Sequence, residues 1–271
     1  MNTKNSMDND HKIESRLSGE IKSFDKVWKD GYFEGEVLDP VGYSTYGPLG
    51  YISVLYALYL ISIKPHVNQE TVALEIGPGR GAFSKAILKH TPRELWCLDA
   101  VSAEDNKFYE YTGNYENVKY IQVEDFSCSM LPENHFNYFF SFGALCHVSF
   151  DGITQYLKNL YPKLQQGAEC FIMVADYDKY NQSLDNIENL SVFKYLPFQK
   201  IIRLNWMLYK RQISKWLTYR RTYPETQEPV PGRWYHAGIK QTCTLLESLG
   251  YTVISEDLGV NQRDPVIYFK K

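Results

Sequence analysis

Short runs rich in apolar residues alternate along most of this chain with longer stretches in which apolar residues recur every three or four positions. The short runs predict buried strands at 71–76, 95–98, 118–123, 136–142, 170–175, 252–255 and 266–269. The longer stretches predict helices at 82–90, 153–164 and 238–249, with a short helix at 103–112 and with Gly167 ending the second helix. Strands that alternate with helices predict an α/β fold, a mainly parallel seven-stranded sheet with helices on both faces.

Two regions lie outside this alternation. Residues 1–70 precede the first strand and are expected to form an extension or cap over the core. Its predicted parts are a frayed polar end, a short helix and an apolar helix, at 1–18, 21–32 and 49–63. The second region, about 178–232, is a predicted helical insertion. We therefore expect residues 71–271 to form one core domain that carries this insertion.

Basic residues crowd the insertion, where the window 194–221 holds eight lysines and arginines and no acidic residue. Three interpretations stay open: a solvated cap face, a surface that receives a phosphorylated or nucleotide-linked acceptor, or a surface that meets an anionic membrane or another subunit. The adjacent Arg220 and Arg221 suit phosphate better than lysines would, because a guanidinium group pairs with two oxygens at once.

The overall composition is that of an ordinary globular chain. Of 271 residues, 44% are apolar and 23% charged, and the net charge of -3 gives no reason to expect nucleic-acid binding. We see no apolar run long enough to cross a bilayer and no secretion signal. The five cysteines are scattered without a C-x-x-C pair, so we expect reduced thiols, no zinc, and a cytoplasmic location.

The strongest chemical signal is the stretch that follows the first predicted strand. Gly77, Gly79 and Gly81 come directly after that strand, and a predicted helix begins at once. Glycines let the backbone approach a ligand closely, and a new helix offers unpaired N–H groups. Asp99 ends the next apolar run, where a nucleoside ribose would need a carboxylate. The stretch therefore predicts a cradle for a nucleoside-containing ligand.

Two families share this layout. Gly77, Gly79 and Ala82 satisfy the dinucleotide fingerprint, so an NAD(P)-dependent oxidoreductase and a non-catalytic nucleotide-binding module stay open. The whole string resembles more closely motif I of the class I S-adenosylmethionine (SAM) dependent methyltransferases, whose acidic residue stands two positions before the first glycine, as Glu75 does. The seven strands and the closing strand pair also resemble the Rossmann-like core of that family, over roughly 71–175 and 237–271.

The resemblance implies SAM as cofactor and S-adenosylhomocysteine as product. Position by position, it implies that one side of the site contacts the methionine and ribose moieties, through Glu75, Gly77, Pro78, Gly79, Gly81, Asp99 and Ala100. It implies further contacts after the third and fourth strands: Asp125 to the adenine amino group, Phe126 to the adenine ring, and Phe142 and Gly143 to the methionine moiety. Glu124 replaces Asp125 if the register slips by one residue.

Three residues are candidates for catalysis. His147 follows the fourth strand and Asp176 the fifth, at the carboxyl edge where open α/β sheets bind ligands. His236 ends the insertion and would return to the same rim. A neutral imidazole beside a carboxylate can accept the proton of a hydroxyl group during methyl transfer. The alternative is that these histidines only cap or pack helices.

The stretch 139–143, together with Cys146 and His147, resembles bacterial sugar O-methyltransferases that decorate surface polysaccharides. That resemblance implies a small-molecule acceptor, a sugar hydroxyl or a phosphorylated or nucleotide-linked one; a small-molecule N-methyltransferase is the alternative. The candidate acceptor contacts are Tyr43, Tyr46, Arg233 and Tyr235. Packing remains an equal explanation for the two N-terminal tyrosines. A divalent metal, a homo-oligomer and peripheral membrane contact are left open.

Overall fold

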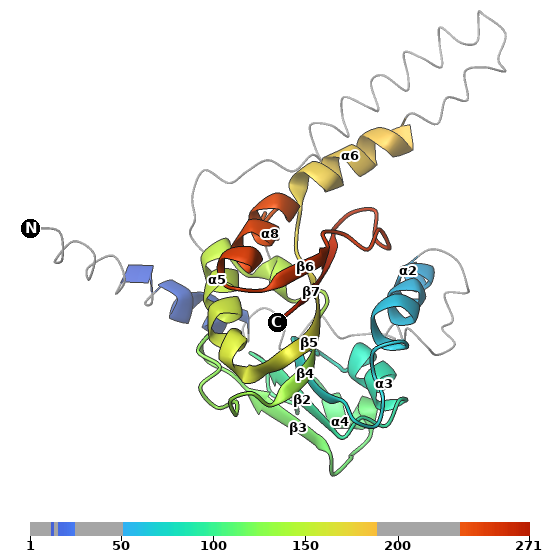
Figure 1. The fold of residues 1–271 in the computed structure, drawn as a ribbon, viewed down its shortest axis with the longest axis vertical. Helices are drawn as coiled ribbons and strands as arrows, with labels where there is room; N and C mark the ends of the chain where they lie inside the picture. The colour runs from blue at the N-terminus through green and yellow to red at the C-terminus, as the bar shows by residue number, and fades with distance from the viewer. Residues whose placement is uncertain (1–11, 14–15, 25–50, 189–233) are drawn as a thin grey trace, which may run out of the picture.

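The computed structural model describes residues 12–13, 16–24, 51–188 and 234–271, and shows a seven-stranded sheet (Figure 1). The strand order is β3-β2-β1-β4-β5-β7-β6. The strands are β1 Val72–Ile76, β2 Glu94–Asp99, β3 Val118–Gln122, β4 Phe136–Ser141, β5 Leu164–Met173, β6 Thr252–Ser255 and β7 Val266–Lys270. The first five strands run parallel, and β7 is antiparallel to both β5 and β6. The predicted α/β fold is therefore confirmed.

Helices cover both faces of the sheet. They are α2 Tyr51–Leu58, α3 Ala82–Leu88, α4 Phe108–Thr112, α5 Phe150–Leu160 and α8 Ile239–Ser248, whereas α6 Tyr177–Glu188 extends away from the sheet (Figure 1). Side chains on β4 alternate between the two faces, because successive residues of a strand point to opposite sides. Phe139 joins the core beneath α5 and α8, whereas Tyr138 and Phe140 join the core beneath α2, α3 and α4. Figure 1 shows these two groups of helices on opposite sides of the sheet.

The strand order reverses direction between β1 and β4. From β1 the chain moves outward to β2 and β3, then returns to the other side of β1 as β4. The connections after these two strands therefore part at the carboxyl edge, which is where doubly wound sheets place their ligands. This topology brings the glycine-rich turn after β1 next to the segment that carries His147.

The prediction for residues 153–167 is wrong in one respect. Helix α5 ends at Leu160, a single 3-10 turn follows over Tyr161–Lys163, and β5 begins at Leu164. Gly167 therefore lies inside β5 rather than at a helix end. Between the pairs Phe136–Leu164 and Tyr138–Glu169, β4 advances two residues while β5 advances five, so β5 bulges there. Gly167 has a φ of +80° at this bulge, a conformation that glycine adopts readily.

The N-terminal segment is ordered earlier than predicted. Residues 16–24 are helical, so the expectation of a frayed end over 1–18 is wrong for its last three residues. Leu17 and Ile21 pack into the core with α5 and α8. The buried carboxylate of Glu20 accepts hydrogen bonds from the Ser149 amide and, at 2.6 Å, from the Ser149 hydroxyl. Ser149 is the N-cap of α5, so the N-terminal helix is fastened to the start of α5.

Several predictions fall on residues that the structure does not describe. They include Tyr43, Tyr46 and Arg233, together with most of the predicted insertion and residues 25–32 of the helix expected at 21–32. The apolar helix expected at 49–63 is found as α2, continued by a π-helical turn over Tyr59–Ile63. Among the helices that are described, we find none long and apolar enough to span a membrane.

Candidate functional site

The turn after β1 makes unusually close contact with the segment after β4. Gly77 has a φ of +71°, and its amide donates to the Leu98 carbonyl at 2.8 Å. A Cβ atom on Gly77 would lie 2.1 Å from the Cβ of Ala144, closer than two non-bonded carbon atoms can approach. Glycine is therefore required at position 77 for the two loops to meet. By contrast, the space beside Gly143 is open, since a Cβ there would have no heavy atom within 4 Å.

Asp99 ties the glycine turn to the end of β2. Its Oδ2 accepts the Gly79 amide hydrogen at 3.0 Å, and its Oδ1 accepts the Val101 amide hydrogen at 2.9 Å. Burial raises the pKa of Asp99 to about 6, although hydrogen bonds from the backbone and from Asn106 favour the ionised form. The carboxylate is ionised at neutral pH and keeps lone pairs for further donors, so it can accept two vicinal hydroxyl groups.

Glu75 lies one strand away from Asp99, near the end of β1. The residue is 3% exposed, and its Oε2 accepts the Ser84 hydroxyl hydrogen at 2.5 Å. Burial raises the pKa of Glu75 to about 8, the hydrogen bond from Ser84 lowers it, and the charge of Asp99 raises it further. The carboxyl group is therefore mostly protonated at neutral pH, and a cation bound nearby would favour its ionisation.

Asp125 and Phe126 follow β3, but they occupy different surroundings. Asp125 is exposed, and its Oδ1 accepts the Ser127 amide hydrogen at 2.8 Å. Phe126 is buried beneath α5, with its ring centroid 4.8 Å from that of Tyr156 in an edge-on contact. The Phe126 ring is thus largely enclosed by the core, and its packing on an adenine ring stays a prediction. Asp125 stays a predicted contact to the adenine amino group.

The segment after β4 positions His147. Phe142 packs against Phe83 of α3, with ring centroids 5.2 Å apart. The chain then turns through a short 3-10 helix, Leu145–His147, in which the His147 amide donates to the Ala144 carbonyl at 2.9 Å. Ala144 is also the residue that faces Gly77. One short turn thus connects the glycine turn to the imidazole of His147.

The segment that returns from the insertion runs along the same edge of the sheet. Its backbone forms hydrogen bonds from Tyr235 to the Cys146 carbonyl at 2.9 Å and from Ala237 to the Ala175 carbonyl at 2.9 Å. Tyr235 is buried, and the ring of Trp234 meets the ring of His147 at right angles, with centroids 5.6 Å apart. The structure therefore brings together the neighbourhoods of His147 and His236, which are far apart in the sequence.

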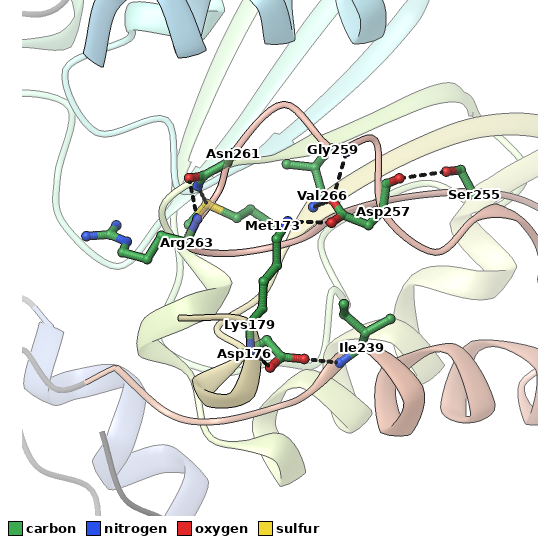
Figure 2. Close-up of polar contacts among 10 residues, drawn as sticks. All are labelled: Met173, Asp176, Lys179, Ile239, Ser255, Asp257, Gly259, Asn261, Arg263 and Val266. Carbon is green, nitrogen blue, oxygen red and sulfur yellow. Dashed lines mark hydrogen bonds and ion pairs between the residues drawn. The ribbon is translucent and has the colours of Figure 1, made fainter. Parts of the chain in front are cut away.

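His236 and Asp176 use their polar atoms to hold the backbone. The Tyr177 amide donates to Nδ1 of His236 at 3.0 Å, so the neutral ring carries its proton on Nε2. Burial lowers the pKa of His236, which favours this neutral form. Asp176 accepts the Lys179 amide hydrogen with Oδ1 and the Ile239 amide hydrogen with Oδ2, both at 2.8 Å (Figure 2). Asp176 thus caps α6 and α8, and His147 is the better placed of the three as a base.

Sequence reasoning missed three residues at this edge. Trp234 and Arg263 stack on each other, with the guanidinium carbon 3.8 Å from the centre of the indole ring. The side chain of Asn106 donates to the Tyr120 hydroxyl at 2.6 Å and supports Asp99. No sequence signal marks these contacts, because each joins segments that only the folded chain brings together.

A metal centre would need several ligating side chains close together. Over the described ranges, we find no cluster of three or more histidine, cysteine, aspartate and glutamate side chains that could hold a metal ion. The five cysteines are all buried free thiols.

Comparisons with known proteins agree with this geometry. Residues 74–172 match the family model of a methyltransferase domain, whereas no curated protein gives a significant match. A SAM-dependent methyltransferase from Mesorhizobium loti is 12% identical, with a TM-score of 0.51 over 80% of this chain and 98% of its own. The 1,6-didemethyltoxoflavin-N1-methyltransferase of Burkholderia thailandensis, with its substrate and S-adenosylhomocysteine bound, is 15% identical, with a TM-score of 0.53 over 96% and 89%.

A third structure, the mitomycin 7-O-methyltransferase MmcR, is 12% identical, with a TM-score of 0.50 over 82% of this chain and 55% of its own. At this level of identity the structures show the fold alone. Together with the domain match, the fold and the glycine turn define a class I methyltransferase domain. Residues 74–172 thus match a methyltransferase domain, and this match favours SAM chemistry over the oxidoreductase that the glycine pattern alone left open.

The residues present fit SAM. Asp99 is an acceptor-only carboxylate at the end of β2, which suits the two ribose hydroxyl groups. The space beside Gly143 is open at the end of β4, where the methionine moiety is expected. Glu75 is a buried acid that a nearby cation would ionise, and SAM carries both an ammonium and a sulfonium group.

Proposed function

We propose that this enzyme transfers the methyl group of SAM to a hydroxyl group of a small acceptor, a sugar or a phosphorylated or nucleotide-linked molecule. The observation that carries the proposal is the short connection between the glycine turn and His147. Ala144 faces Gly77 on one side and accepts the His147 amide hydrogen on the other. An imidazole fixed this close to the cofactor turn is well placed to act on a bound acceptor.

SAM supplies an activated methyl group on a sulfonium leaving group, so the protein need only align the reactants and handle the acceptor proton. In the proposed mechanism the glycine turn, Glu75 and Asp99 fix the cofactor. His147 accepts the hydroxyl proton as the oxygen attacks. The edge-on contact with Trp234 holds the imidazole of His147 in place. Closure of the site around the acceptor would exclude water.

Support for a sugar-like hydroxyl comes from two features of the sequence. The stretch 139–147 resembles sugar O-methyltransferases, and the basic window 194–221 suits a phosphate group on the acceptor. The structural neighbours include one O-methyltransferase and one N-methyltransferase, so they favour neither atom. An amine acceptor need only arrive neutral, which makes dependence on a base the feature that separates the two alternatives.

The remaining assignments are part of the same proposal. Residues 1–70 act as a cap, and 71–271 form the catalytic core with its insertion. Tyr43, Tyr46, Arg233 and Tyr235 contact the acceptor, and Asp125 contacts the adenine amino group. A cytoplasmic location, a homo-oligomer, peripheral membrane contact and a divalent metal stay predictions.

The proposal is tested by measuring S-adenosylhomocysteine release with a panel of acceptors: methyl glucoside, glucose 6-phosphate, UDP-glucose and simple amines. The His147→Ala variant is compared with His135→Ala, because His135 lies before β4 at the opposite edge of the sheet. We expect turnover of a hydroxyl acceptor to fall about 100-fold or more in His147→Ala, with cofactor affinity kept and His135→Ala near wild type. Turnover of amines alone, unchanged in His147→Ala, would contradict the proposal.

A further inference from the structure

Trp234 lies between two side chains of very different chemistry. The ring of His147 meets it edge-on, with centroids 5.6 Å apart, and the guanidinium carbon of Arg263 lies 3.8 Å from its ring centre. The position of Trp234 is fixed by its own backbone, since its carbonyl accepts the hydroxyl hydrogen of Tyr177 at the start of α6. One indole ring therefore contacts both the candidate base and a permanent positive charge.

The loop that carries Arg263 is held rigidly (Figure 2). Oδ1 of Asp257 accepts the amide hydrogens of Gly259 at 3.0 Å and Val266 at 3.2 Å, and its Oδ2 pairs with Lys179 of α6. Oδ1 of Asn261 accepts the Arg263 amide hydrogen at 3.1 Å. The backbone at Arg263 is thus placed before any ligand arrives.

The guanidinium group itself is held on two sides. One face rests on Trp234, and Nε donates to Oδ2 of Asp264 at 2.6 Å. Asp264 is fully buried, so it needs this positive partner. Among the residues that the structure describes, we find no hydrogen-bond acceptor for the two terminal nitrogens of Arg263, whose side chain is 39% exposed. Figure 2 shows this side chain extending away from Met173 and Asp257.

We propose that Arg263 binds an oxyanion, a phosphate or carboxylate group, on the methyl acceptor. This inference rests on the proposed function, because it places the oxyanion beside the same tryptophan, Trp234, that contacts the base acting on the acceptor hydroxyl. A guanidinium group with its Nε edge occupied still presents two terminal nitrogens, which match two oxygens of one oxyanion. The stack on Trp234 orients the group and lowers the entropy lost when the acceptor binds.

The geometry also favours acceptors of a particular shape. Arg263 and His147 both contact the Trp234 ring, so an acceptor that uses both must reach past that ring from the oxyanion to the reacting hydroxyl group. A monosaccharide with a phosphate or carboxylate substituent has this reach, whereas a small alcohol has not. The site thereby selects charged, polyhydroxylated acceptors over simple alcohols.

The test uses the full chain saturated with S-adenosylhomocysteine, and its probes are inorganic pyrophosphate and malonate. Calorimetry records binding of each probe to wild type, Arg263→Lys and Arg263→Gln. Arg263→Lys keeps a positive charge beside Asp264 but loses the planar pair of nitrogens. The matched control is Arg93→Gln, since Arg93 is an exposed arginine just before β2, at the amino edge of the sheet.

We expect saturable binding of at least one probe, weakened about tenfold or more in both Arg263 variants and unchanged in Arg93→Gln. Stronger binding of pyrophosphate than malonate assigns a phosphate acceptor, and the reverse order assigns a carboxylate. Trp234→Leu, which leaves the Arg263–Asp264 pair in place, should also weaken binding. It serves as the second variant if the Arg263 variants do not fold.

Equal probe affinity in wild type and Arg263→Lys would overturn the oxyanion site, as would equal losses in Arg93→Gln. Binding of S-adenosylhomocysteine is measured first in every variant. If it persists while the Arg263 variants bind the probes normally, only this inference fails. If the wild type does not bind S-adenosylhomocysteine, the proposed function fails.

Discussion

At the scale of single residues, the two carboxyl groups at the ends of β1 and β2 are buried, and their pKa values are raised as a result. Burial raises the pKa of Glu75 to about 8 and that of Asp99 to about 6. Both values lie above those of an unfolded chain, so the folded protein binds more protons than the unfolded one. The stability of the cofactor-free protein should therefore fall as the pH rises.

The first prediction concerns Glu75→Gln. Between pH 6 and 8 Asp99 goes from about half to fully ionised and contributes little, so the loss of stability comes chiefly from Glu75. We expect the free energy of unfolding of the wild type to fall by about 2 kcal/mol over this range, and Glu75→Gln to show a flatter profile. Urea unfolding at pH 6, 7 and 8 measures this, with the exposed Glu110→Gln as control. A wild-type slope retained in Glu75→Gln would show that another group titrates there.

The second prediction concerns Asp99 and the cofactor. Ribose hydroxyl groups need an ionised acceptor, so the affinity for S-adenosylhomocysteine should be level above pH 7 and fall by up to about tenfold per pH unit below 6. Asp99→Asn should bind about 10–100 times more weakly and lose this pH dependence. Calorimetric titration at pH 5, 6, 7 and 8 decides the matter. If the affinity of Asp99→Asn for S-adenosylhomocysteine keeps the same pH dependence, a different residue is responsible for it.

At the scale of elements, the packing of the loops after β1 and β4 limits what the glycine turn can tolerate. Gly77 and Gly143 both have a positive φ, at +71° and +79°. A Cβ at Gly77 would lie 2.1 Å from that of Ala144, whereas one at Gly143 would have no heavy atom within 4 Å. An alanine at either position would have the same unfavourable positive φ, but only at position 77 would its Cβ also collide with a neighbouring loop.

The third prediction follows from this pair. Gly77→Ala should destabilise the cofactor-free protein by about 1–3 kcal/mol more than Gly143→Ala does, because only the first substitution also pushes the two loops apart. Thermal and urea unfolding of the two variants provides the comparison. Adding Ala144→Gly to Gly77→Ala should recover part of the loss, and failure to do so would mean that the loops do not meet as described.

The elements themselves could be predicted well where the sequence is locally unambiguous. All seven strands were expected near their observed positions, because each is a short apolar run bounded by polar or turn residues. The start of β5 was missed, since Leu164 continues the apolar spacing of α5 and only pairing with β4 shows that residues 164–169 belong to the sheet. The helix over 16–24 was placed too late, because its buried face depends on α5 and α8.

The candidate site, too, could be predicted where its residues form a local sequence pattern and not where they meet through long-range packing. Glu75, the glycines and Asp99 form a local pattern that one stretch of sequence displays. The burial of Phe126 beneath α5 could not be predicted, because nothing in its neighbourhood indicates whether the ring points to the core or to a ligand. The stack of Trp234 and Arg263 could not be predicted from the sequence. It joins the segment that returns from the insertion to the β6–β7 loop, and only long-range packing brings these two segments together.

At the scale of the whole molecule, the insertion leaves and rejoins the core at nearly one point. Asp176 caps both α6 and α8, the Tyr177 hydroxyl bonds to the Trp234 carbonyl, and the Ala237 amide bonds to the Ala175 carbonyl. These contacts all lie on the core side of the insertion. The seven strands and every residue assigned to SAM also lie outside it.

The fourth prediction is that the insertion serves the acceptor rather than the cofactor. A variant in which residues 181–233 are replaced by a flexible linker of about six residues keeps Tyr177, Lys179 and Trp234, whose contacts hold the two stems together. We expect it to fold and to bind S-adenosylhomocysteine within about threefold of wild type, because the cofactor contacts are untouched. Methyl transfer should fall by at least about 100-fold, since the basic window 194–221 and Arg233 are lost.

Calorimetry and product release are measured on the same preparation. A folded variant that loses cofactor affinity would make the insertion part of the SAM site, and one that retains full turnover would leave acceptor binding to residues of the core, with Arg263 as the foremost of them.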